Sequence, residues 1–183
     1  MPHRFILSYV YELPFGRGKR FGNAMPRLMD TLFGGWMLDG ITNYQSGGAF
    51  GISANNVCRC FNQASYANSK GYSAKLEGRA EDRLNRWFDT NGFTQPDQFT
   101  IGNMGPRSAD LRSGKIANWD FGISKDFRPV ETLRVQFRSD FLNAWNHPRF
   151  SGPNTSVTSS SFGVVTSQAN SPRQIQFGLK LLW

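Results

Sequence analysis

The chain has no hydrophobic run long enough to cross a membrane as a helix. Its 183 residues are 39% hydrophobic, and no window approaches the roughly 18 consecutive apolar residues that a transmembrane helix needs. This absence excludes membrane helices but not a membrane barrel, because barrel strands alternate apolar and polar residues and barely register on hydropathy. The negative mean hydropathy therefore does not distinguish a soluble protein from a barrel.

Residues that bind metals are scarce. There are two cysteines, Cys58 and Cys60, and two histidines, His3 and His147, among 183 residues. The histidines are far from the cysteine pair in sequence, whereas a metal site needs further ligands at workable spacing. We therefore expect no metal and no other cofactor. Because a disulfide between cysteines two positions apart is strained, we expect a structural or incidental role for the pair, with a loop disulfide as the alternative.

No arrangement of nucleophile, base and acid indicates an enzyme. His147 is followed by a proline in a segment without strand periodicity. No serine–histidine–aspartate set and no pair of carboxylates is suggested by spacing. We expect no catalytic residues and no enzymatic activity.

Acidic residues are fewer than basic ones, 13 against 21, which gives a formal net charge of +8. A basic balance of this kind raises nucleic acid as a partner. The basic residues are scattered, however, and the densest group is Arg17, Lys19 and Arg20. No basic helix or aromatic RNA-binding motif accompanies them, so we assign the charge to solvated turns and loops and expect no nucleic-acid partner.

Alternation of apolar and polar residues is abundant, and it is most regular at the carboxyl end. Such a period of two predicts a strand with one apolar and one polar face. A bare aromatic at the end of an amphipathic strand is unusual in a soluble protein, and it suits the interfacial girdle of a membrane β-barrel. The apolar set consists of Ile175, Phe177, Leu179, Leu181 and Trp183.

Four earlier segments alternate in the same way. Aromatic residues stand near the ends of their apolar faces, where two girdles would flank a lipid band. The predicted strands cover residues 4–13, 36–45, 118–127, 132–143 and, at the end, 173–183. The candidates for the girdles are Tyr9, Tyr11, Trp36, Tyr44, Trp119 and Phe127.

Polar residues occupy the opposite faces of the last two predicted strands. Consecutive polar positions on one strand face need water or partners, so we expect them to face the lumen of a barrel. A hydrated wall without a specific role is the alternative interpretation. The candidates are Arg134, Gln136, Arg138, Asp140, Gln174, Gln176 and Lys180.

The connections between the predicted strands alternate between long and short. Residues 46–117 and 144–171 lack a strand pattern, which is wrong for a compact soluble domain and normal for the extracellular loops of a barrel. Within the first of them we expect a short helix in residues 77–88 and a brief strand at 99–101. A tight turn is predicted at residues 128–131, on the opposite side.

A short helix is predicted near residues 24–33, where apolar residues recur at helical spacing. Asn23 can cap it, Pro26 falls in its first turn, and Gly34 ends it. An amphipathic helix of this size can lie on a membrane surface. We expect it instead to pack against the neighbouring sheet.

These patterns together predict an all-β fold. About five antiparallel amphipathic strands form an open, curved part of a large transmembrane β-barrel, with long extracellular loops. Residues 1–183 then form one barrel segment. The apolar stretch that follows Met1 has no small-residue cleavage site after it, so we expect no signal peptide in these residues.

Six segments, taken in order, carry a resemblance to a known family. They are HRFILSYVYELPFGRG (3–18), GGWMLDGITNYQSG (34–47), RWFDTNGF (86–93), NWDFGISKDF (118–127), VQFRSDFLNAWNHPRF (135–150) and FGVVTSQANSPRQIQFGLKLLW (162–183). Jointly they resemble the carboxy-terminal part of TonB-dependent outer-membrane receptors. The most similar group is the Oar-like receptors, whose amino terminus carries a carboxypeptidase-regulatory-like domain.

This resemblance implies a part in the energised uptake of a scarce solute across the outer membrane of a Gram-negative bacterium. In that family about twenty-two strands close the barrel, a plug fills the lumen, and an inner-membrane complex supplies energy through an amino-terminal motif. Neither plug nor motif is found in these residues, so the implied contribution is barrel wall and loops.

The resemblance also implies partners. They are outer-membrane lipid, the remaining barrel strands and the plug, and the barrel-assembly machinery, which would read the terminal strand that ends at Trp183. The energising complex would be reached only through the missing amino-terminal part. The alternative function is a soluble antiparallel β-sheet module that binds carbohydrate or another ligand, and it would need a second sheet to cover the apolar strand faces.

Overall fold

The computed structural model describes residues 3–59 and 65–183, and the chain divides into two compact units. The first, called the strand unit here, consists of Arg4–Tyr44, Ala117–His147 and Ser171–Trp183. The second, called the loop unit, is built mainly from Gln45–Ile116 and Pro148–Asn170. No helix within the described ranges is both long and apolar enough to span a membrane.

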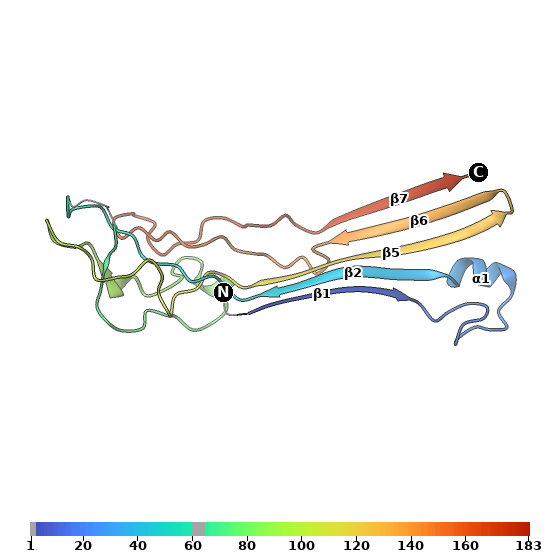
Figure 1. Cartoon of the computed structure of the whole chain (residues 1–183), viewed down its shortest axis with the longest axis horizontal. Helices are drawn as coiled ribbons and strands as arrows, with labels where there is room; N and C mark the ends of the chain where they lie inside the picture. Colours follow the sequence, from blue (N-terminus) through green and yellow to red (C-terminus); the bar gives the residue numbers. More distant parts are fainter. Residues whose placement is uncertain (1–2, 60–64) are drawn as a thin grey trace. The chain divides into compact units, whose positions relative to one another are not determined.

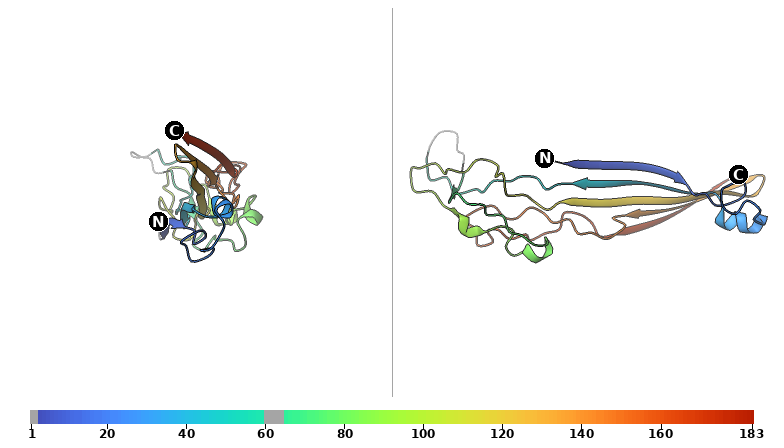
Figure 2. Two further views of the ribbon diagram at one scale, coloured as in Figure 1. Left: turned by 90° about the vertical axis from the view of Figure 1, so that its right-hand side faces the viewer. Right: turned by 90° about the horizontal axis from the view of Figure 1, so that it is seen from below.

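The strand unit is one sheet of five strands in the order β1-β2-β5-β6-β7. Neighbouring strands run in opposite directions, and both views of the ribbon show them side by side (Figures 1 and 2). The sheet is open, with β1 and β7 as its edges. The predicted all-β fold with an open antiparallel sheet is confirmed. The strands are β1 (Arg4–Glu12), β2 (Trp36–Gln45), β5 (Ile116–Val130), β6 (Leu133–Leu142) and β7 (Gln174–Leu182).

The register of the strands separates apolar from polar side chains. Phe121 of β5 lies opposite Phe141 of β6, and Phe137 of β6 lies opposite Leu179 of β7. Because successive side chains of a strand point to opposite faces, these pairs share one face, called the apolar face here. The alternate positions form the other face, called the polar face.

The helix is present but differs from its prediction at both its start and its packing. Helix α1 (Arg27–Phe33) begins after Pro26 without a side-chain cap. The predicted cap, Asn23, instead accepts a hydrogen bond from the Gly18 N–H at 3.0 Å, which closes the preceding loop. No residue of α1 is buried, so the expectation that it packs against the sheet is wrong.

The turn between β5 and β6 is tighter than predicted. β5 continues to Val130, which pairs with Leu133, and only residues 131–132 form the turn. The register shifts between Phe127 and Val130, in the stretch that contains Pro129. Proline has no N–H to donate to a ladder, and such an irregularity lets the strand pass it. The turn predicted at 128–131 is therefore wrong.

The two long connections fold together into the loop unit. The Ser53 N–H donates to the Thr155 carbonyl at 2.9 Å, and the Val165 N–H donates to the Leu84 carbonyl at 2.8 Å. β3 (Asn68–Ser69) and β4 (Phe93–Thr94) pair as a short ladder. The helix expected within 77–88 is reduced to the 3₁₀ turn η1 (Glu81–Arg83), with η2 (Thr90–Gly92) after it, and residues 99–101 form no strand.

An aromatic cluster forms the core of the loop unit. Phe88 is 1% exposed, and its ring lies 5.3 Å from that of Phe162 and 5.8 Å from that of Phe93, measured between centroids. Both contacts are edge-to-face, the favoured geometry for aromatic pairs. The indole N–H of Trp87 donates to the Arg112 carbonyl at 2.8 Å, which satisfies the polar atom of a buried ring. Among the described residues no cysteine is free, and Cys60 lies outside them.

Replacing Phe88 by alanine is expected to unfold the loop unit selectively. Loss of a fully buried phenylalanine costs about 3–5 kcal/mol, and here the loss falls on a core separate from the sheet. Hydrogen exchange should accelerate at backbone amides such as Trp87 and Val165, with the strands unchanged. Ile101→Ala, at an exposed position, is the matched control and should leave exchange unaltered. Equal effects of the two substitutions would contradict this core assignment.

Candidate functional site

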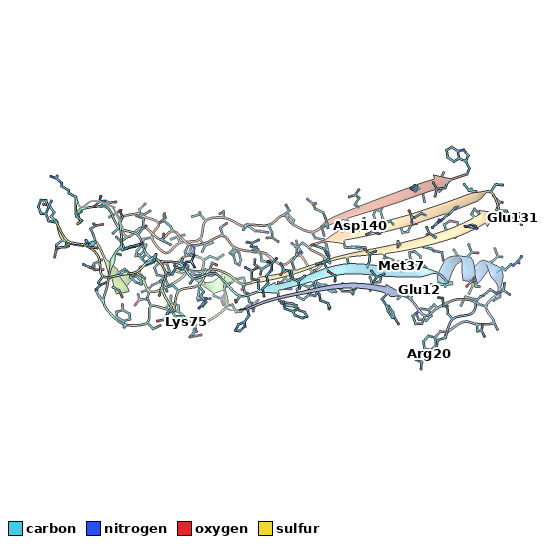
Figure 3. The ribbon with its side chains drawn as sticks, in the orientation of Figure 1. Glu12, Arg20, Met37, Lys75, Glu131 and Asp140 are labelled. Carbon is cyan, nitrogen blue, oxygen red and sulfur yellow. The ribbon has the colours of Figure 1, made fainter. Side chains whose placement is uncertain are left out.

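The structure brings all seven predicted polar residues of β6 and β7 to the polar face. Gln136 lies opposite Lys180, and Asp140 lies opposite Gln176. The remaining pairs follow the same alternation, with Arg134 opposite Leu182, Arg138 opposite Gly178 and Gln174 opposite Leu142. Figure 3 shows Asp140 at the opposite end of the sheet from Glu131, so the set extends along the strands.

Arg138 is the centre of this face. Its Nε donates to both carboxylate oxygens of Asp140, at 2.8 and 3.1 Å. Its Nη2 donates to Asp39 Oδ2 at 2.9 Å. Asp39 belongs to β2, whereas Arg138 belongs to β6, so the guanidinium reaches across the whole width of β5. The ion pairs therefore join β2 to β6 through side chains, across the intervening β5.

Gly122 of β5 leaves the space that this reach requires. Gly122 is paired with Asp140 in the ladder. A Cβ atom at Gly122 would lie 2.7 Å from Asp140 Oδ1 and 2.9 Å from Arg138 Nη2. A side chain at this position would push the ends of Asp140 and Arg138 out of their present geometry. The Arg138 side chain is 47% exposed, so each pair contributes about 0–1 kcal/mol.

Two further polar groups lie at the ends of the same face. Arg134 Nη2 donates to Asp126 Oδ2 at 2.6 Å near the β5–β6 turn. Asp120 accepts from Asn118 Nδ2 at 2.7 Å and from the Asn143 N–H at 2.8 Å near the other end. Asp39, Asp120 and Asp126 were missed as site residues. In β5 the signal was the alternation of Asp120 and Asp126 with Gly122, and in β2 it was the position of Asp39 between the apolar-face residues Leu38 and Gly40.

The aromatic residues proposed for two girdles mostly lie at the two ends of the apolar face. At one end Tyr44 meets Trp119 edge-to-face, with ring centroids 4.8 Å apart. At the other end Trp36 meets Phe137 at 6.1 Å, and the Lys125 ammonium lies 5.3 Å from the centroid of Trp36. Phe127, opposite Val135, belongs to this second end.

Tyr9 and Tyr11 occupy different positions on the edge strand β1. The Tyr9 ring lies over Gly40, because a Cβ atom on that glycine would be 2.7 Å from the phenolic oxygen. Tyr9 thus covers a gap in the middle of β2 rather than marking a strand end. Tyr11 is nearer the end of β1 and is 53% exposed.

The apolar residues of the terminal strand also share the apolar face. Ile175, Phe177 and Leu181 lie opposite Phe141, Ser139 and Val135 respectively. Ser139 is 4% exposed, and its hydroxyl has no hydrogen-bond partner among the described residues. Trp183 follows the last strand and is 95% exposed.

The loop unit carries a separate polar cluster at Asp89. Asp89 accepts from the Tyr72 hydroxyl at 2.9 Å and from the Asn91 N–H at 3.2 Å, and it pairs with Arg86. The hydrogen bond from Tyr72, helped by those from Arg86 and Asn91, lowers the pKa of Asp89. The same bond raises the pKa of Tyr72. Asp89 caps η2 with this carboxylate, so the cluster fixes the turn before β4.

A comparison with known families matches residues 1–176 to the family described as "Outer membrane beta barrel domain". The chain belongs to this outer-membrane β-barrel family. No curated protein and no solved structure matches it. The strand unit is therefore a piece of barrel wall located in the outer membrane, and its apolar face is the side suited to lipid.

Gly122→Val is expected to abolish the coupling between Arg138 and Asp39 in the barrel wall. A double-mutant cycle with Arg138→Gln and Asp39→Asn, read by urea unfolding in micelles, should give about 0.5–1 kcal/mol in the parent protein. The value should fall to near zero beside valine at 122. Gly178→Val is the control, because a Cβ at 178 meets only the Arg138 carbonyl, at 3.9 Å. An undiminished coupling in Gly122→Val would refute the space argument.

Proposed function

We propose that the chain supplies carboxy-terminal barrel wall and loops to a TonB-dependent receptor of the Oar-like group. The receptor takes up a scarce solute across the outer membrane of a Gram-negative bacterium, and the chain itself is not catalytic. The observation that carries this proposal is the ion-paired polar face, which extends over β2, β5 and β6 around Arg138. The sequence resemblance in six ordered segments supports the same group.

The polar face suits contact with a plug that fills the lumen. Arg138 and Asp140 are both partly exposed, at 47% and 34% of their side chains, while their charges are already balanced within the wall. A wall of this kind offers hydrogen bonds without a large net field, so a plug can be held and released at modest cost. In the proposal, release of the plug opens the path along this face.

The open edges of the sheet support a larger ring. The outer strands β1 and β7 each have one neighbour. In lipid an unpaired strand edge leaves backbone N–H and C=O groups unsatisfied, and only closure of the ring satisfies them. We propose that the remaining receptor strands complete the ring at these two edges, with the assembly machinery reading the terminal apolar set. Besides this sheet, the described residues contain only the two-stranded ladder β3-β4 of the loop unit, whereas a soluble binding module would need a larger second sheet to cover the apolar face.

The loop unit is proposed as the extracellular part that first meets the solute. It presents exposed apolar side chains at Phe99 and Ile101, 68% and 64% exposed, and the Arg59 guanidinium lies 5.8 Å from the centroid of the Phe99 ring. Phe99 adopts a positive φ of 62°, a backbone conformation that costs energy in a bulky residue. Strain at an exposed aromatic is consistent with a contact residue.

The uptake proposal is tested by growth on limiting nutrients. We expect deletion of the receptor gene and deletion of the energising inner-membrane complex to impair growth on the same scarce solute, found by screening a panel that includes ferric chelates and oligosaccharides. Excess solute should restore growth of both strains, because general porins then suffice.

A passive barrel would behave differently. Its deletion would impair growth, whereas loss of the energising complex would have no effect on the same solute. That result would overturn the energised mechanism and leave the barrel-wall role in place.

A further inference from the structure

The segment between β1 and β2, residues 14–35, is called the linker here. It carries an amphipathic surface. Its helix α1 has one apolar side, formed by residues spaced three or four apart and exposed to between 45% and 82%. These residues are Leu28, Met29, Leu32 and Phe33. The opposite side of the helix carries Asp30, whose carboxylate accepts the Arg17 N–H at 2.7 Å. The polar side therefore has partners within the linker, and the apolar side has none among the described residues.

Contacts at the end of α1 place the helix on the apolar-face side of the sheet. The indole N–H of Trp36 donates to the Leu32 carbonyl at 3.0 Å. The ammonium of Lys125 donates to the Gly34 carbonyl. Both side chains belong to the apolar face, which is the face suited to lipid. Helix α1 therefore ends beside the apolar face, at the end of the sheet where β2 begins (Figure 1).

A second feature of the linker is its charge. Residues 14–35 contain four basic side chains and one acidic side chain. The acidic one, Asp30, is held by the Arg17 backbone, and Lys19 pairs with Glu12 at 2.7 Å. The basic side chains are Arg17, Lys19, Arg20 and Arg27. Figure 3 shows Arg20 beyond the end of β1, at the same end of the sheet as Glu131.

The loop that leads into α1 combines these charges with exposed aromatic rings. Phe15 and Phe21 are 47% and 48% exposed, and their ring centroids lie 5.6 Å apart. The Arg20 guanidinium lies 5.5 Å from the centroid of Phe21. An arginine above an aromatic ring can keep its charged guanidinium in water or among headgroups while the ring contacts an apolar phase.

We propose that the linker docks on an anionic phospholipid surface. Helix α1 lies in the interface with Leu28 and Leu32 among the acyl chains. The side chains of Arg17, Arg20 and Arg27 contact the phosphate headgroups. An apolar helix side with nearby cations is the arrangement that binds such interfaces. The inference depends on the barrel wall in the outer membrane and is independent of the proposed transport.

The test places an environment-sensitive NBD fluorophore on Leu28→Cys in the full protein, reconstituted in phosphatidylethanolamine vesicles that contain phosphatidylglycerol. We expect blue-shifted emission and strong quenching by nitroxide-labelled phosphatidylglycerol. Thr31→Cys, on the polar side of the same helix, is the matched control and should be quenched several-fold less. The parent protein, treated with the same label, gives the background labelling.

Two outcomes overturn the proposal. Equal, water-like emission at positions 28 and 31 means that α1 does not enter the membrane. Blue-shifted emission at 28 without nitroxide quenching means that protein, not lipid, covers the helix. Neither outcome affects the growth test of transport, so the two proposals fail separately.

The role of charge is tested by one triple variant that carries Arg17→Gln, Arg20→Gln and Arg27→Gln together. We expect it to lose most of the preference of position 28 for phosphatidylglycerol over phosphatidylcholine vesicles. The control is a triple variant of the loop unit, Arg79→Gln, Arg107→Gln and Lys115→Gln, which loses the same charge. It should retain the preference for phosphatidylglycerol. If both variants behave alike, net charge rather than the linker determines lipid preference, and the proposed headgroup contact is wrong.

Discussion

The register of the five strands is the constraint on which the rest of the sheet depends. Side chains alternate with a period of two, so a slip of one residue exchanges the two faces of a strand. Such a slip in β6 would move Arg138 from the polar face to the apolar face, away from Asp39 and Asp140. It would also place Phe137 among polar neighbours. The separation of apolar and polar side chains already favours this register, and the ion pairs around Gly122 stabilise it further.

The sequence was sufficient for the sheet because alternation is a local signal. All five strands of the large sheet were predicted, and all seven polar candidates share one face, whereas the short strands β3 and β4 were missed. The loop unit was missed because its core comes from residues far apart in sequence, such as Phe88 and Phe162. No short sequence periodicity predicts a contact between residues so far apart. Composition alone suggested unstructured loops, since glycine, serine and asparagine are as common there as in flexible segments.

Two predictions about helix α1, its cap and its packing, were wrong. Asn23 was a reasonable helix cap, but its side chain closes the loop at Gly18 instead. The apolar side of α1 suggested packing on the sheet, yet it stays exposed in the linker. An aqueous protein would bury these residues, whereas a protein at a membrane surface has lipid available to cover them. We therefore interpret the exposed apolar side of α1 as a sign of a lipid environment and not of a misfolded helix.

In the outer membrane, one face of the strand unit meets lipid and the other meets the lumen. Spin labels at successive positions 134–141 of β6 in the outer membrane test it most directly. We expect positions 135, 137, 139 and 141 to be accessible to oxygen and protected from a water-soluble relaxant, with the reverse at 134, 136, 138 and 140. Equal access to the water-soluble relaxant at all eight positions, or the opposite phase, would show that the two faces do not divide lipid from lumen.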